Sequence, residues 1–302
     1  MGKCAQPQKL HEETSYAEVV LLRVNGMENV HDKPDPRQGF SRKWPLTPYT
    51  LEVREILGPE PPFETSCTIA YLGGCTLSGS IEGAGLTRNG EICPTQFNLA
   101  VRLRRAFPGQ PFVIRNFGEA GVTATQFLCR GFIENVRQVL PHLDIAFLRY
   151  GIADRKHEGI PKTIESVGQL CVQLEEAFTG ITIVIETDMW VDYPRHYLFD
   201  RNPRLAPLYE KLRDLAASEG YAVVDIFAKV EEETQKGNWD LRLRSVPVEG
   251  ISSIADDSFD ELFAADSAFF TNIHPNARCY GLIAEWEVAK LRELFGDTLP
   301  HT

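Results

Sequence analysis

The chain has 302 residues, of which 43% are hydrophobic and 24% are charged, and its formal net charge is −11 at pH 7. This is the composition of a globular protein with enough apolar residues to bury a core. The acidic excess argues against a general nucleic-acid or anionic-membrane partner, because phosphate groups are bound mainly by clusters of Lys and Arg.

The chain lacks the sequence signals of several other classes of protein. No apolar stretch approaches the roughly 20 residues of a membrane-spanning helix, and the first residues lack the apolar core of a signal peptide. We therefore expect a soluble, cytoplasmic protein. The seven cysteines are widely spread without CxxC spacing, which predicts reduced thiols and no zinc site. Neither GxxxxGK[ST] nor HExxH occurs, so we expect no cofactor and no metal.

Residues 1–65 are predicted to form an N-terminal extension. Two runs rich in Val, Leu and Ile, at 17–24 and 49–56, favour strands, and a loop rich in Pro, Gly and Asp separates them. The Pro-rich break at 58–62 ends the segment. The extension is too short to bury a core of its own, so we expect it to dock on a main domain formed by residues 66–302.

After this break, apolar runs alternate with amphipathic segments. The runs that favour strands are 68–72, 112–117, 143–149, 181–186 and 221–227, and helices are predicted at 97–107, 126–140, 164–178, 205–217 and within 274–295. Such alternation is typical of a parallel sheet with helices on both faces, a three-layer α/β/α sandwich. Ligands of these sheets bind beyond the carboxyl ends of the strands.

The turn after the second of these strands has the sequence Asn-Phe-Gly-Glu-Ala-Gly, from Asn116 to Gly121. Glycine permits a positive φ angle or a close approach of another group to the backbone. A helix that begins after such a turn directs its free N–H groups toward it. The turn is therefore predicted to hold an anion or a developing oxyanion.

From about residue 66 to the C-terminus, the blocks at the predicted strand ends resemble the SGNH (GDSL-type) hydrolase family. Asn116–Gly121 matches the family's Asn-x-Gly-x-x-Gly block, and His274-Pro275-Asn276 matches the end of its Asp-x-x-His-Pro-Asn block. Two further blocks have diverged: 73–79 aligns with the family's Gly-Asp-Ser, and 151–154 with its Gly-x-Asn-Asp. The resemblance implies a flavodoxin-like parallel sheet.

The departures from the family pattern fall on its catalytic positions. In the family, a Ser attacks an acyl carbonyl, a His takes its proton and an Asp orients the His. The Ser N–H, a Gly N–H and an Asn side chain hold the oxyanion. In this chain the resemblance places Cys75 at the position of the Ser, His274 at that of the His and Thr271 at that of the Asp. The three oxyanion positions are those of Cys75, Gly118 and Ala153.

A Cys75–His274 pair is chemically plausible without the orienting acid. A thiol ionises more readily than a hydroxyl and is intrinsically more nucleophilic. The resemblance then implies a hydrolase or acyltransferase that acts on a small-molecule ester, thioester or amide. Thr271 or a backbone carbonyl could orient His274.

The oxyanion site is the less complete part of this hypothesis. Loss of the family's Asn removes one donor, an effect on the order of 10²–10³ in rate. Gly118 is retained, with Asn116 beside it in the motif. Arg149, Tyr150 or Arg155, all near the end of the same strand, could supply the missing donor.

Other interpretations stay open at this point. The alternative function is a catalytically inactive SGNH-like scaffold that binds a small ligand or a protein partner, because fold alone does not determine function. A shifted turn would make Ser78 or Ser80 the nucleophile, and Cys75 could be a small buried hydrophobe. Asp154 is predicted to cap the following segment. A group of side chains that could line a substrate pocket or form a packed lid comprises Trp190, Tyr193, His196 and Tyr197.

Overall fold

The computed structural model describes residues 60–77, 94–119, 121–190, 201–236, 275 and 277–301. Its centre is a five-stranded sheet with the order β2-β1-β3-β4-β5, in which all neighbouring strands are parallel. The strands are β1 (Cys67–Gly73), β2 (Phe112–Asn116), β3 (Ile145–Arg149), β4 (Thr182–Glu186) and β5 (Ala222–Val224). This is the flavodoxin-like order, and it confirms the predicted α/β fold. The strands expected at 17–24 and 49–56 lie outside the described residues.

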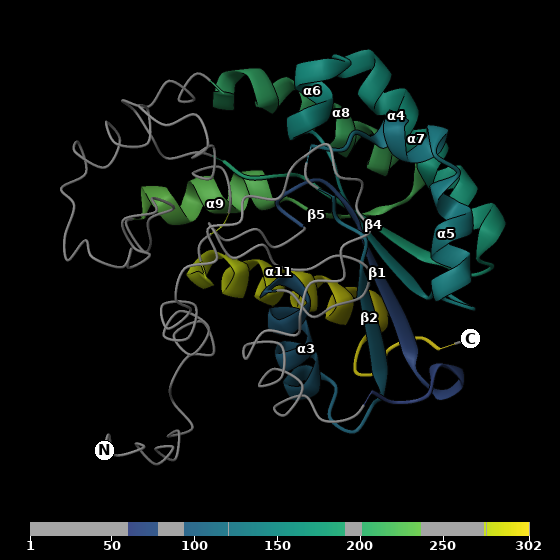
Figure 1. Ribbon diagram of the computed structural model, residues 1–302. Helices are drawn as coiled ribbons and strands as arrows, with labels where there is room; N and C mark the ends of the chain where they lie inside the picture. The colour runs from purple at the N-terminus through teal and green to yellow at the C-terminus, as the bar shows by residue number, and fades with distance from the viewer. Residues whose placement is uncertain are drawn as a thin grey trace, which may run out of the picture.

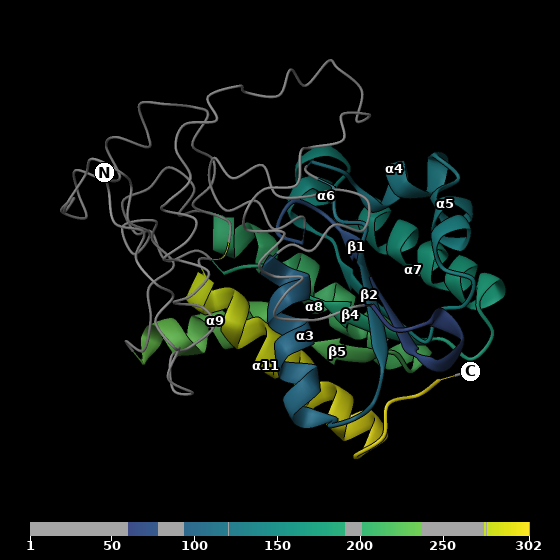
Figure 2. The same cartoon turned by 60° about the horizontal axis from the view of Figure 1, so that its bottom comes forward.

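Helices cover both faces of the sheet, as Figure 1 shows. One face packs against α4, α5, α7 and α8, and the other against α3, α11 and the first residues of α9. Both views show α3 and α11 side by side (Figure 2). The bounds are α3 (Pro94–Ala106), α4 (Ala124–Cys129), α5 (Phe132–Val139), α6 (Ile152–His157), α7 (Ile160–Ala177), α8 (Arg201–Glu219), α9 (Ile226–Gln235) and α11 (Ala277–Phe295), with a short 3-10 helix at Phe63–Thr65.

The central strands are apolar because both of their faces are covered. All seven residues of β1 and all five of β3 are buried. Successive side chains point to opposite faces of a strand, so Ile69 and Tyr71 pack on the α3–α11 side, and Ala70 and Leu72 on the other. This explains why these strands appear in the sequence as continuous apolar runs.

The single helix predicted at 126–140 is wrong in two respects. The helix begins earlier, at Ala124, and it is divided into α4 and α5. Gly131 lies between the two parts with φ of 63°, a left-handed conformation that interrupts a right-handed helix. The apolar periodicity continues across the break because both parts pack on the same core cluster.

The strand predicted at 221–227 is correct only in its first part. β5 ends at Val224, and Asp225 caps α9 by accepting a hydrogen bond from the Ala228 N–H at 3.3 Å. Thr187, after β4, supports this cap: its hydroxyl donates to Asp225 at 2.8 Å and accepts from the Phe227 N–H at 2.8 Å. A carboxylate at a helix start satisfies N–H groups that would otherwise lack a partner.

The chain enters the domain beside β2. Arg115 on that strand forms a two-pronged ion pair with Glu60, with nitrogen–oxygen distances of 2.5 and 2.7 Å. Its guanidinium also lies 5.2 Å from the centre of the Phe63 ring. Within the residues that the structure describes, no helix is long and apolar enough to cross a membrane.

Candidate active site

Cys75 lies in a tight turn at the carboxyl end of β1. The Leu77 N–H donates to the Gly74 carbonyl at 3.1 Å, which closes the turn around Cys75 and Thr76. The Gly74 N–H donates to the Arg149 carbonyl at 3.1 Å, so the turn is fixed to the end of β3. Cys75 is half-buried and packs against the core cluster on the α4–α8 side. This is the point where the strand order reverses, the usual ligand site of such sheets.

Gly73 is required by a close contact between strands. A Cβ atom at this position would lie 2.1 Å from the Arg149 carbonyl oxygen, which is backbone and cannot move aside cheaply, whereas a Cβ at Gly74 would meet nothing within 4 Å. We expect Gly73→Ala to lower the free energy of unfolding by about 3 kcal/mol, the upper end of the usual cost of overpacking, and Gly74→Ala to change it by less than about 0.5 kcal/mol. Urea unfolding of the two variants would check this, and equal stabilities would contradict it.

Asn116 joins the turn after β2 to the turn after β1. Its side-chain N–H donates to the Leu77 carbonyl at 2.6 Å, and its side-chain oxygen accepts from the Gly118 N–H at 2.8 Å. The Glu119 N–H adds a bond to the Gly73 carbonyl at 2.9 Å. The Gly118 N–H therefore has an intramolecular acceptor, with which an oxyanion would have to compete.

Two of the first three N–H groups of the helix after this motif already donate to side chains. The Ala124 N–H donates to the Asp154 carboxylate at 2.6 Å, and the Gln126 N–H donates to the Thr123 hydroxyl at 3.2 Å. Gly121 does take the positive φ angle, 76°, that the motif predicts. The motif thus shapes the backbone, while protein side chains already satisfy the start of α4.

Asp154 has a different place from the one predicted. Gly151 is the residue that precedes α6, and Asp154 lies in the first turn of that helix. Its carboxylate accepts from the Gly151 N–H at 3.0 Å as well as from α4. Asp154 therefore joins two helix starts, which the sequence of one segment could not reveal.

His274 lies outside the described residues, whereas Pro275 and α11, which follow it, are described. Pro275 is buried, and α11 begins two residues later. On the first turn of α11, the Tyr280 hydroxyl donates to the Thr76 carbonyl at 3.1 Å. The amino end of α11 is therefore in direct contact with the turn that contains Cys75.

Beneath these turns lies a fully buried polar cluster on the α3–α11 face of the sheet. We call it the charged cluster, and its members are Tyr71, Arg149, Glu186 and Glu287. Arg149 contacts Glu186 at 2.8 Å and Glu287 at 3.1 Å, and the Tyr71 hydroxyl donates to Glu287 at 2.6 Å. Arg149 and Glu186 are paired in register at the ends of β3 and β4.

The charged cluster has two carboxyl groups for one guanidinium. Burial raises the pKa of Glu186, and proximity to Glu287 adds to this, although Arg149 opposes it. Burial also raises the pKa of Glu287. Two carboxylates and one guanidinium would leave an excess negative charge in a medium of low polarity. The pair therefore retains one proton at a pH where an exposed glutamate is ionised.

This retained proton predicts an unusual dependence of stability on pH. The pKa of Glu186 is raised in the folded state, so between about 4.5, its ordinary value, and the raised value the folded protein binds more protons than the unfolded chain. Stability in this window falls as pH rises, by up to about 1.4 kcal/mol per pH unit. Glu186→Gln does not titrate and should lose this slope.

Denaturant unfolding of wild type and Glu186→Gln at a series of pH values would measure this difference. We expect the variant to gain stability relative to wild type as pH increases above about 4.5. Glu232→Gln is the matched control, since Glu232 is exposed and its pKa is lowered by Lys236. A constant difference between wild type and Glu186→Gln across the pH series would contradict the retained proton.

Neither side chain considered as a replacement oxyanion donor at the end of β3 faces open space. Arg149 is held by two carboxylates, and its Nη1 atom has no hydrogen-bond partner among the described residues. Tyr150 is buried on the opposite face, where its ring packs edge-on against Phe127 at 5.5 Å. Either side chain would have to leave these contacts to reach an acyl group at Cys75.

Other candidates from the sequence are only partly covered by the structure. Arg155 lies on α6 and is half-buried, and Trp190 is half-buried between both core clusters. The candidates that lie outside the described residues are Ser78, Ser80, Tyr193, His196, Tyr197 and Thr271. Among the described residues, no group of three His, Cys, Asp or Glu side chains is arranged to hold a metal ion.

The described cysteines differ strongly in their surroundings. Cys67, Cys171 and Cys279 are buried, and burial raises the pKa of each thiol, to about 12 for Cys171. Cys129 is exposed on α4, and Cys75 is half-buried. A buried thiol with a raised pKa is a poor nucleophile. Of the described cysteines, only Cys75 combines partial access with a place at a strand end.

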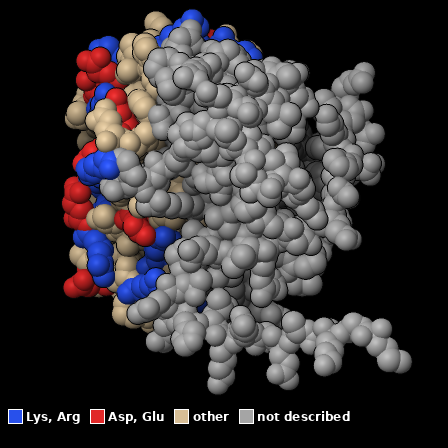
Figure 3. All heavy atoms as spheres, turned by 90° about the vertical axis from the view of Figure 1, so that its left-hand side faces the viewer, with Lys and Arg blue, Asp and Glu red and all other residues tan. Residues whose placement is uncertain are grey.

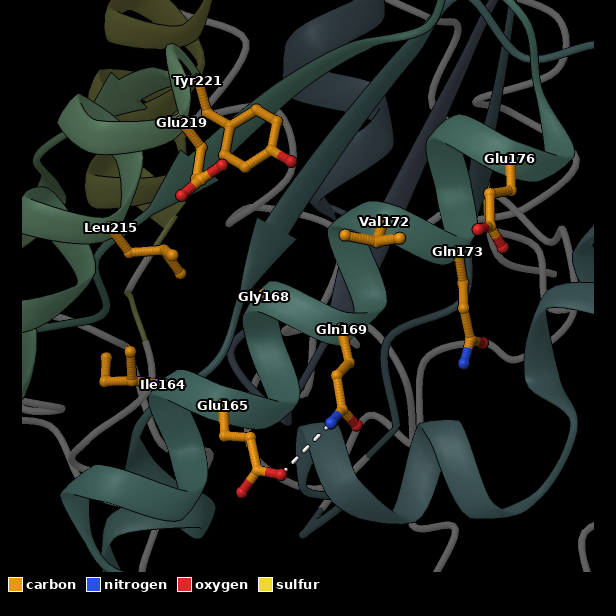
Figure 4. Close-up of a pocket in the computed structure, with 10 residues that line it drawn as sticks. All are labelled: Ile164, Glu165, Gly168, Gln169, Val172, Gln173, Glu176, Leu215, Glu219 and Tyr221. Atoms are coloured by element: carbon orange, nitrogen blue, oxygen red, sulfur yellow. Dashed lines mark hydrogen bonds between the residues drawn. The ribbon is translucent and has the colours of Figure 1, made fainter.

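A hollow of about 610 Å³ lies elsewhere, on the outer surface between α7 and α8 (Figure 4). Ile164, Gly168, Val172 and Leu215 supply its apolar part, and Glu165 on its rim accepts a hydrogen bond from Gln169 at 3.2 Å. None of its lining residues follows the carboxyl end of a strand. It is therefore separate from the site around Cys75.

A smaller hollow of about 290 Å³ lies between α3 and α11 and is lined by arginines. Two of these arginines contact the facing helix: Arg102 pairs with Glu285 at 2.9 Å, and Arg292 donates to the Ala106 carbonyl at 3.1 Å. Acidic and basic side chains are interspersed over the described part of the face in Figure 3. Because Arg102 and Arg292 each have a partner on the facing helix, we interpret these two arginines as packing contacts between α3 and α11.

Comparison with solved structures supports the fold. LAE5, an α/β hydrolase from the metagenome of Lake Arreo, Spain, aligns with a TM-score of 0.52 and 16% identity over 76% of this chain and 96% of that one. A catalytic mutant of Axe2, an acetylxylan esterase from Geobacillus stearothermophilus, aligns with a TM-score of 0.50 and 11% identity over 79% and 99%. The chain shares the fold of these hydrolases.

The similarity lies in the fold, at a sequence identity of 11% for Axe2 and 16% for LAE5. No family model and no curated protein matches this chain. At such low identity the shared fold indicates where a site should lie, at the carboxyl ends of the strands, but not which chemistry it performs. The chemistry has to be argued from Cys75 and its surroundings.

Proposed function

We propose that this chain is a hydrolase or acyltransferase that uses Cys75 as the nucleophile and His274 as the general base. The observation that carries the proposal is the hydrogen bond between Tyr280 and Thr76, 3.1 Å long. It connects the residue after Cys75 to the first turn of the helix that follows His274. The turn that carries Cys75 is therefore in contact with a helix that begins three positions after His274 in the sequence, which supports the pairing of two residues 199 positions apart.

In the proposed reaction, His274 takes the thiol proton and the Cys75 sulfur forms a bond to the acyl carbon. The bond from that carbon to the leaving oxygen, sulfur or nitrogen breaks, and His274 returns its proton to the leaving group. Water, or another hydroxyl, thiol or amine, then attacks the thioester and releases Cys75. The structural neighbours include an acetylxylan esterase, so esters are the first substrate class to test.

The oxyanion of each tetrahedral intermediate would be held by the backbone N–H groups of Cys75 and Gly118. Backbone donors at a fixed turn need no rearrangement as charge develops, which is what such stabilisation requires. Because Gly118 also donates to Asn116, the amide oxygen of Asn116 would share this N–H with the substrate. Asn116 would act mainly by holding the two turns together through Leu77.

The proposal is tested by the rate at which each cysteine reacts with iodoacetamide at a series of pH values, followed by peptide mass spectrometry. We expect Cys75 to react fastest and to show a pH midpoint below the ordinary thiol value of about 8.5. Cys129, which is exposed, serves as the reference, and Cys67, Cys171 and Cys279 should scarcely react.

The same measurement on His274→Ala decides between the proposed enzyme and an inactive scaffold. If the two residues are coupled, the Cys75 midpoint moves upward in the variant while Cys129 is unchanged. If Cys75 reacts no faster than Cys129, or does not respond to the loss of His274, the nucleophilic mechanism is wrong. The chain would then be better studied as a ligand-binding or partner-binding protein.

A further inference from the structure

One buried side chain attaches a helix directly to two strands and, through Arg149, to a third. Glu287, on α11, accepts from the Tyr71 hydroxyl of β1 at 2.6 Å and from Arg149 of β3 at 3.1 Å. Arg149 in turn binds Glu186 of β4. All four side chains are at most 1% exposed. The charged cluster therefore connects α11 to the centre of the sheet directly below the turn that contains Cys75.

Glu287 and Tyr280 lie on the same face of α11. Seven residues separate them, which is close to two helical turns. Glu287 binds the strand ends, and Tyr280 binds the Thr76 carbonyl beside Cys75. The position of Glu287 along the sheet thus sets where the first turn of α11 can lie.

The remaining contacts of α11 with the sheet do not select one position so strongly. The side chains that α11 buries in this core include Cys279, Ile283, Ala284 and Leu291, which are apolar. Apolar contacts are non-directional, so a helix held by them alone could shift or rotate at modest cost. A buried ion pair is stable only when its two charged groups face each other, so it disfavours other positions of the helix. Selection of the packing register is the best-attested role of polar groups in protein cores.

We propose that Glu287 and Arg149 are positioning residues, which hold α11 in the one register that brings its amino end, and His274 just before it, to the Cys75 turn. The catalytic consequence rests on the proposed function, but the anchoring does not. Two further charged groups lie near the charged cluster. Asp188 follows β4 and accepts from Thr76 at 3.0 Å, and Arg102 on α3 pairs with Glu285.

Substitution of Glu287 by leucine provides a direct test, because it removes the anchor without burying an unpaired charge. Arg149 would keep Glu186 as its partner, and that carboxyl could then ionise fully. Glu287→Gln should restore the anchor, since its amide oxygen can accept from Arg149 and its amide N–H can donate to the hydroxyl oxygen of Tyr71. Glu285→Leu is the matched control, two residues away on the same helix but at the surface, where its carboxylate pairs with Arg102.

Two readouts separate the anchoring from the chemistry. Hydrogen–deuterium exchange of residues 277–283 reports local opening of the amino end of α11, and we expect about tenfold faster exchange in Glu287→Leu. Iodoacetamide alkylation of Cys75 at neutral pH reports its coupling to His274, and we expect about a tenfold loss of rate. In both Glu287→Gln and Glu285→Leu, the exchange rate and the alkylation rate should lie within about threefold of the wild-type values.

The outcomes distinguish the two proposals. If exchange at 277–283 is the same in Glu287→Leu and Glu285→Leu, the anchoring inference is overturned, whatever Cys75 does. If exchange at 277–283 increases in Glu287→Leu but the alkylation rate of Cys75 is the same in wild type and His274→Ala, the proposed function is wrong and the anchoring inference stands. If Glu287→Leu does not fold, Tyr71→Phe replaces it, because it deletes only one hydroxyl. Unchanged exchange in Tyr71→Phe would then overturn the inference.

Discussion

Replacing Cys75 with alanine is expected to lower the turnover of an activated aryl acetate by at least about 10³-fold, because loss of the proposed nucleophile would leave only binding and oxyanion contacts. The release of the aryl alcohol measures turnover, and mass spectrometry of the trapped protein detects the acetyl group on the peptide that contains Cys75. Cys129→Ala, which alters an exposed thiol on α4, is the matched control and should be unchanged.

Cys75→Ser tests why a thiol would be needed here. A serine hydroxyl depends on a strongly oriented base, and loss of the orienting acid from a Ser–His pair costs about 10⁴ in rate. The sequence resemblance aligns Thr271 with the position of that acid. We therefore expect Cys75→Ser to resemble Cys75→Ala. A serine variant as active as wild type would contradict the argument that the thiol compensates for the missing Asp.

His274→Ala is expected to lower turnover by about 10²–10⁴-fold, the usual contribution of a general base. The loss should be largest near neutral pH and smaller at alkaline pH, where the Cys75 thiol ionises without help. Turnover of wild type and variant at a series of pH values would show this. His301→Ala, at an exposed position near the C-terminus, is the control. A uniform loss at every pH would assign His274 a structural role.

The strands and their order along the chain could be predicted from the sequence, because a strand buried on both faces must be apolar throughout. The runs at 68–72, 112–117, 143–149 and 181–186 coincide closely with β1 to β4. The errors arose where a local signal was overruled by neighbours. Gly131 divides one predicted helix, and Asp225 ends β5 because its carboxylate caps α9.

The candidate site, too, could be predicted from the sequence only in part. The amino-acid sequence by itself indicated the turns that carry Cys75 and Gly118, since glycines at strand ends leave a local pattern. Only the tertiary structure decided which polar side chains of the site already have hydrogen-bond or ion-pair partners within the protein. Asn116 reaches Leu77 across 39 residues, and Arg149 meets Glu287 across 138. Such contacts depend on which elements pack together, and a charged residue at the end of an apolar run does not reveal its partner. Arg149, considered from sequence as an oxyanion donor, is instead enclosed by carboxylates that other parts of the chain supply.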